Sequence, residues 1–128
     1  MMRGFAVAAL LGLAGCPAVP ATPGKSARAL GDNTCEAVTW SCVGMKPGTE
    51  EAWGCTEGTD NERARFEASC TLEANGRFAL NACPRDTLVG GCTIASGSTC
   101  RTTWFAAPTP ASDIDSECAR TGALRVAR

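Results

Sequence analysis

The chain of 128 residues carries 12 basic and 13 acidic side chains and contains no histidine. The nearly balanced charge leaves no basic patch that could bind nucleic acid. Because histidine is both the commonest zinc ligand and the usual base at neutral pH, its absence argues against a zinc site and against general base catalysis. We therefore expect a protein that is not an enzyme and that holds neither a metal nor another cofactor.

Residues 1–15 have the pattern of a secretory leader. Arg3 supplies a positive charge, residues 5–13 are apolar, and the small residues Ala14 and Gly15 follow. An apolar run of this length suits a signal peptide, whereas a transmembrane helix needs ~20 residues. The sequence thus predicts export of the protein from the cytoplasm.

The end of this leader is its most specific feature. Leu13-Ala14-Gly15-Cys16 resembles the lipobox of bacterial lipoproteins, in which the cysteine receives a diacylglycerol and becomes the first residue of the mature protein. The resemblance implies lipidation of Cys16 and anchoring of the protein to a membrane through that lipid. The alternative is an ordinary signal peptide that is cut after Ala21, which would remove Cys16 with the leader.

Residues 16–33 are expected to comprise the lipidated cysteine and a flexible linker. Three prolines, several alanines and no apolar periodicity leave this segment too little apolar surface to offset the entropy lost on ordering. Pro17 follows Cys16, at the position that influences sorting of lipoproteins between inner and outer membranes. It is not the aspartate associated with inner-membrane retention, so the outer membrane, on its periplasmic face or at the cell surface, is favoured.

The chain has nine cysteines, an odd number that would leave one thiol unpaired in an oxidising compartment. Assigning Cys16 to the lipid leaves eight, which in a short exported chain predict four disulfides. No two of them have the CxxC spacing typical of zinc ribbons and thioredoxin-like sites. The eight are Cys35, Cys42, Cys55, Cys70, Cys83, Cys92, Cys100 and Cys118.

From residue 34 onward the cysteines fall into two sets of four. The members of the second set follow those of the first at offsets of 48, 50, 45 and 48 residues. In both sets, alternating apolar residues surround the second cysteine, a second strand carries an aromatic residue, a helix carries the fourth cysteine, and a short apolar stretch follows. We therefore predict an α+β fold of two repeated strand-strand-helix-strand modules, residues 34–81 and 82–128, packed as one small disulfide-rich domain.

Local signals predict where these elements begin and end. Thr59 and Glu62 form a capping box before the first helix, and Thr109 is the expected N-cap of the second. Gly122 is the expected left-handed C-cap of the second helix. The Gly-Gly pair at residues 90–91 predicts a β-bulge in the first strand of the second module.

The spacing of the cysteines leaves their pairing open. Eight cysteines allow many pairings, and far fewer if every bond stays within a module. We favour bonds from the helix to the first strand, which join Cys42 with Cys70 and Cys92 with Cys118. The remaining bonds would then join Cys35 with Cys55 and Cys83 with Cys100.

The second module also resembles a known family. Residues 83–122 begin with Cys83-Pro84, continue with a Leu-Val-Gly-Gly-Cys strand, and include the aromatic pair Trp104-Phe105 and a cysteine on the helix. This segment resembles small cysteine-rich modules of exported lipoproteins of myxobacterial type. The first module, which lacks the Cys-Pro start, resembles them only loosely. The resemblance implies a fold and a location, and it implies no activity.

Two groups of carboxylates accompany the expected helices. Acidic residues in the first turn of a helix complement its dipole, and the others are typical of a solvated face. We therefore interpret them as structural, rather than as a glycosidase-like acid pair or calcium ligands. The groups are Glu57, Asp60 and Glu62 before the first helix and Asp113, Asp115 and Glu117 on the second.

Arg101, Trp104 and Phe105 are the candidate binding residues. They lie on one expected strand, and arginine and aromatic residues anchor many interfaces. Strand alternation puts Trp104 and Phe105 on opposite faces, so packing between the two modules is the alternative explanation. The polar hairpin at residues 44–51 is a second candidate surface.

Together these features predict a lipid-anchored protein of the cell envelope that acts as a non-catalytic binding or structural module. Its partners would be the membrane, through the lipid on Cys16, and an envelope protein or extracellular ligand that the sequence does not identify. A disulfide-stabilised protease inhibitor that presents the 44–51 hairpin is the alternative, and an enzyme is less favoured still.

Overall fold

The computed structural model describes residues 33–72 and 75–128. The expected signal peptide at residues 1–15, the expected lipidation site Cys16 and the expected linker up to residue 32 lie outside the described residues.

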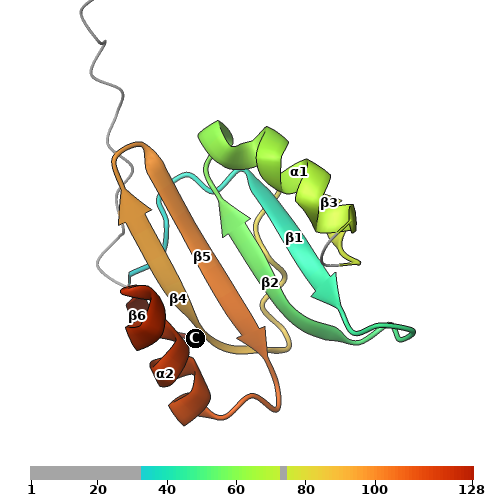
Figure 1. Ribbon diagram of the computed structural model, residues 1–128, viewed down its shortest axis with the longest axis vertical. Coiled ribbons are helices and arrows are strands. Elements are labelled where there is room, and N and C mark those ends of the chain that lie inside the picture. Colours follow the sequence, from blue (N-terminus) through green and yellow to red (C-terminus); the bar gives the residue numbers. More distant parts are fainter. Residues whose placement is uncertain (1–32, 73–74) are drawn as a thin grey trace, which may run out of the picture.

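The described chain forms six strands and two helices (Figure 1). A short 3-10 helix at Asp60–Glu62 leads into the first α-helix. The elements are β1 (Trp40–Met45), β2 (Ala52–Gly58), α1 (Arg63–Leu72), β3 (Arg77–Ala79), β4 (Leu88–Ser96), β5 (Thr99–Ala106), α2 (Ala111–Thr121) and β6 (Leu124–Ala127).

All of these strands join one antiparallel sheet in the order β3-β1-β2-β5-β4-β6. The central strands β2 and β5 come from different halves of the chain, and they pair from Gly54 opposite Phe105 to Gly58 opposite Arg101. The predicted α+β class is therefore confirmed for the described chain. The two halves contribute to a single continuous sheet.

Both helices lie on the same face of the sheet, which we call the helix face. In Figure 1, α1 overlies the β1 end of the sheet and α2 the β4 end, with β2 and β5 between them. The strand register places one row of directly paired residues across the sheet. In order along the row they are Phe78, Cys42, Thr56, Thr103, Cys92 and Arg125.

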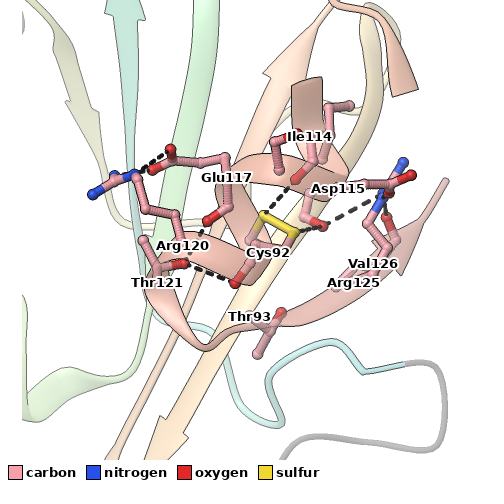
Figure 2. The surroundings of a disulfide bond; sticks show 12 residues. Cys92, Thr93, Ile114, Asp115, Glu117, Arg120, Thr121, Arg125 and Val126 are labelled. Atoms are coloured by element: carbon pink, nitrogen blue, oxygen red, sulfur yellow. Dashed lines mark hydrogen bonds and ion pairs between the residues drawn. A yellow bond between two sulfur atoms is a disulfide. The ribbon is translucent and has the colours of Figure 1, made fainter. Parts of the chain in front are cut away.

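Two disulfides attach the helices to this face, and they are the two helix-to-strand bonds expected from the sequence. Cys42 of β1 bonds to Cys70 of α1, and Cys92 of β4 bonds to Cys118 of α2. Figure 2 shows the second of these bonds beneath α2, close to Ile114. Each helix is thus held covalently over one end of the sheet.

The other two disulfides join the halves of the chain, and here the expected pairing is wrong. Cys35 bonds to Cys100 rather than to Cys55, and Cys83 bonds to Cys55 rather than to Cys100. The sheet topology is the reason, because β2 and β5 are neighbours at its centre. Cys55 lies directly opposite Trp104 of β5, so it is within reach of a segment that enters from the other half.

These two bonds lie on the face of the sheet opposite the helices, which we call the loop face. The segments around Cys35 and Cys83 pack there in place of helices. A cluster of buried side chains fills the space between these segments and the sheet. Its members are Cys55, Cys83, Leu88, Trp104, Ala106 and Val126.

Candidate functional site

The structure does not bring the three predicted binding residues together. Trp104 points to the loop face, where it is only 2% exposed. Arg101 and Phe105 lie on the helix face, as alternation along β5 requires. The Arg101 guanidinium lies 4.9 Å from the centre of the Phe66 ring and 3.5 Å from a carboxylate oxygen of Glu62, so it serves to pack α1 and the turn before it onto the sheet.

The acidic group before α1 is also dispersed. Glu57 is fully buried on the loop face, away from Asp60 and Glu62. Its Oε1 accepts hydrogen bonds from Arg85 Nη2 at 2.7 Å and Trp104 Nε1 at 2.9 Å. Its Oε2 accepts one from the backbone N–H of Cys83 at 2.7 Å. Both oxygens of this carboxylate therefore have hydrogen-bond partners. They fix the segment around Cys83 and Arg85 to the central strands β2 and β5.

A pocket of about 370 Å³ opens on the helix face between α1 and the β1–β2 hairpin. Apolar groups make up most of its wall, and three neutral polar side chains complete it. The side chains and glycine that line it are Cys42, Gly44, Met45, Pro47, Trp53, Thr56, Phe66, Ser69, Cys70 and Asn75. Every lining residue in the described part of the chain is uncharged, and the Cys42–Cys70 disulfide fixes the helical wall to the strand.

Trp53 is the most exposed aromatic group of this pocket, with 41% of its surface accessible. The register between β1 and β2 shifts here, from Gly44 opposite Gly54 to Met45 opposite Ala52, which leaves Trp53 as the extra residue of a β-bulge. Its indole lies directly on Gly44, where a Cβ atom would be 2.3 Å from Trp53 Cε2. The absence of a side chain at Gly44 therefore lets the indole lie flat against β1.

The corresponding place in the second half of the chain is different. Ile94 stands two residues after Cys92, as Gly44 stands two residues after Cys42. The cavity there measures about 200 Å³, and its lining includes Ile94, Arg101 and Glu117. An uncharged pocket with an exposed indole is thus a feature of the first half, rather than a consequence of placing a helix over a strand.

The sequence did not identify Trp53 as a site residue, because it follows the alternation of a core aromatic. Only the bulge moves it to the helix face, and the single glycine that follows it, Gly54, is a weaker signal for a bulge than a Gly-Gly pair. The predicted hairpin surface at residues 44–51 comes closest, since Met45 and Pro47 at its base line the pocket.

Within residues 33–72 and 75–128, no group of three histidine, cysteine, aspartate or glutamate side chains is arranged to hold a metal ion. Neither helix of this part of the chain has the length and apolar character needed to cross a bilayer. Comparison of the chain with protein-family models, with curated proteins and with solved structures gave no match.

Proposed function

We propose that the protein is a lipid-anchored, non-catalytic binding module of the cell envelope that holds its ligand in the pocket beside Trp53. The observation that carries this proposal is the half-exposed indole in a wall of uncharged side chains. Clefts that bind small molecules are mainly apolar, include aromatic side chains and carry a few oriented polar groups. The pocket has all three properties.

Two features favour a location in the envelope. Four disulfides are typical of an oxidising, extracytoplasmic compartment. The lipobox-like residues 13–16 then supply an anchor at Cys16, and residues 16–33 a linker between the lipid and the folded domain. Because Pro17, and not an aspartate, follows Cys16, we propose that the anchor lies in the outer membrane.

The intact mass of the protein from its native membrane tests the anchor. We expect a chain that begins at Cys16 and carries a lipid, with eight alkylation sites that appear only after reduction. An unlipidated chain that begins near Thr22 would contradict the anchor and would indicate a diffusible protein.

We further propose that the two halves are repeats of one module. In support, both halves have the element order strand-strand-helix-strand, and the sheet order is symmetric about the β2–β5 pair. The disulfides that cross between the halves are reciprocal, because each joins the first cysteine of one half to the third cysteine of the other. The repeat accounts for the scaffold that the two halves share. The pocket is specific to the first half, which has Gly44 where the second half has Ile94.

Protease inhibition has less support. The hairpin tip folds into a closed turn, in which the backbone N–H of Lys46 donates to the Glu51 carbonyl at 2.8 Å and that of Thr49 to the Lys46 carbonyl at 3.1 Å. An extended peptide backbone that could lie in a protease cleft is therefore not presented there.

Ligand binding is tested by NMR on the mature chain with Cys16→Ser, which removes the lipidation site. A set of small ring compounds, neutral and charged, is titrated while the Trp53 indole N–H signal is followed. We expect at least part of the set to shift this signal and the amide signals of Ser69 and Asn75. Trp53→Ala is the control and should abolish binding. Shifts confined to other surfaces would contradict the proposed function and leave a structural role.

A further inference from the structure

We infer that the pocket selects an uncharged small molecule that has an apolar ring and a hydroxyl or amide group. This inference rests on the proposed function and narrows it to a class of ligand.

No charged side chain of residues 33–72 and 75–128 lines the pocket, and the charges beside it on the hairpin and on β3 form ion pairs. Lys46 Nζ lies 2.8 Å from a carboxylate oxygen of Glu51, and Arg77 Nη2 lies 4.0 Å from one of Glu50. A charged ligand would lose its hydration in the pocket without gaining a partner of opposite charge, which is costly. An uncharged ligand does not incur this cost.

The shape and polarity of the wall indicate the form of the ligand. The exposed Trp53 indole offers a flat surface against which a ring can pack, and the Phe66 ring, which stacks on Trp40, adds apolar wall to the pocket. Ser69 donates its hydroxyl to the Phe66 carbonyl at 3.4 Å and retains its lone pairs as acceptors. Thr56 and Asn75 add a hydroxyl and an amide, so one polar group on the ligand can be matched.

The surrounding strands favour a small molecule over a peptide. β2 lies between β1 and β5, so its backbone is paired on both sides beneath the pocket. β3 pairs with β1 from Ser41 to Val43, so only Gly44 and Met45 at the end of β1 leave an edge beside the pocket, of two residues, to which a peptide could add as a further strand. The volume of about 370 Å³ is at the lower end of the range for small-molecule sites.

The test compares three probes of similar size and different charge: cyclohexanol, cyclohexanecarboxylate and cyclohexylamine at pH 7. Each is titrated by NMR into the mature chain with Cys16→Ser. We expect cyclohexanol to shift the Trp53 indole N–H signal with an affinity at least tenfold higher than that of either charged probe. Equal affinities at the same signals would overturn the selectivity and leave the proposed function standing. If no probe shifts these signals, both are overturned.

Two glutamate substitutions on α1 serve as a matched pair. Ser69→Glu introduces a charge into the wall, as Glu117 does in the second half, whereas Ala68→Glu places the same charge on an exposed neighbour outside the pocket. We expect Ser69→Glu to weaken cyclohexanol binding at least fivefold and Ala68→Glu to leave it unchanged. Equal loss in both variants would contradict the inference. The dispersion of the amide spectrum verifies that each variant is folded.

Discussion

Glu57 brings a carboxylate into the core of the loop face, where Arg85 is its ionic partner. Arg85 also lies over the ring of Trp104, at 4.1 Å from the ring centre, so the three side chains form one unit. The unit connects the segment that carries Cys83 to both central strands. Breaking such a buried ion pair leaves a charge without its partner, which costs free energy of folding. The stability of the protein should therefore be sensitive to substitution of Glu57.

Glu57→Gln tests that dependence. The amide preserves the size of the side chain but loses the charge that Arg85 and the Cys83 N–H contact. Hydrogen bonds to charged groups contribute ~1.5–3 kcal/mol each. Because the Arg85 side chain is 40% exposed, solvent screening reduces the loss, and we expect the free energy of unfolding in urea to fall by about 1–2 kcal/mol.

The matched control is Glu51→Gln, which removes a carboxylate from the solvent-exposed pair with Lys46. Such pairs contribute little to stability, so no resolvable change in the urea midpoint is expected. An equal effect of the two substitutions would show that burial of Glu57 does not matter.

The pH dependence of Glu117 is a second prediction at the scale of a residue. Hydrogen bonds from the Arg120 guanidinium lower the pKa of Glu117 from its ordinary value of 4.5. Figure 2 shows the side chains of this pair beside one another on α2. A lowered pKa in the folded state means that the pair contributes its stabilisation above the pKa of the unfolded chain and loses it as the pH falls through the folded value.

We therefore expect the Glu117 carboxyl carbon to titrate below 4.5 in NMR, and Arg120→Gln to move the midpoint back toward that value. An unchanged midpoint in the variant would contradict the assigned cause. Because the pair is exposed, the urea midpoint at neutral pH should not change.

At the scale of the helices, the ends were predicted less well than the helices themselves. Gly122 is the left-handed C-cap of α2, with a φ of 67°, as expected. Thr59 occupies the N-cap position of the 3-10 helix that leads into α1, but the capping box itself is wrong, since the Thr59 hydroxyl donates to Asn61 Oδ1 and caps no helical amide. The expected N-cap Thr109 instead donates its hydroxyl to the Ala106 carbonyl, and Pro110 occupies the N-cap position of α2. At both positions the threonine hydroxyl bonds to another partner, the Asn61 side chain or the Ala106 carbonyl, and this replaces the expected cap.

The strands show the same division between local and non-local signals. The bulge expected at residues 90–91 is present beside them, where the register shifts between Leu88 and Gly90. The glycine pair correctly predicted this bulge. The bulge at Trp53 has only the single Gly54 beside it as a signal, and the place of the indole depends on its packing against Gly44 of the neighbouring strand. The candidate site is built on that non-local packing, so the sequence analysis did not find it.

The two helices differ in what holds them to the sheet, and this leads to a prediction for the elements. Ile114 of α2 is only 1% exposed and packs in a cluster with Cys92 and Cys118, which Phe105 and Ala123 extend. On α1, Phe66 is half-buried against Trp40, with ring centres 4.7 Å apart. Removing a disulfide should therefore affect α1 more than α2.

The comparison uses Cys42→Ser with Cys70→Ser and, as the matched pair, Cys92→Ser with Cys118→Ser. The two disulfides span 28 and 26 residues, so the loss of chain constraint is nearly the same, at about 3.5 kcal/mol for loops of this size. By hydrogen exchange, we expect the amides of α1 to lose protection in the first variant while those of α2 keep theirs in the second. Equal loss of protection would show that packing of Ile114 adds nothing.

For the whole molecule, the pairing across the halves was the part of the fold least accessible to sequence reasoning. Strand alternation and helix spacing indicate which cysteines share a face within a half, and the two helix-to-strand bonds that we favoured among the open pairings are present. Whether the third cysteine meets the first of its own half or of the other depends on which strand is the neighbour of β2. That neighbour is β5, and no local sequence pattern predicts this strand pairing.

The crossing disulfides make a binary prediction about the intact molecule. A specific protease site is introduced between Asn81 and Ala82, two exposed residues where the halves meet, and the folded protein is cleaved there. With Cys35 bonded to Cys100 and Cys55 to Cys83, the two fragments are joined by two covalent links. The cleaved protein should therefore run as one species under denaturing conditions without reductant and separate only when reductant is added. Pairing within each half would release two fragments without reductant. Because the test depends only on which sulfurs are joined, it separates a sheet closed across its centre from two modules that merely pack together.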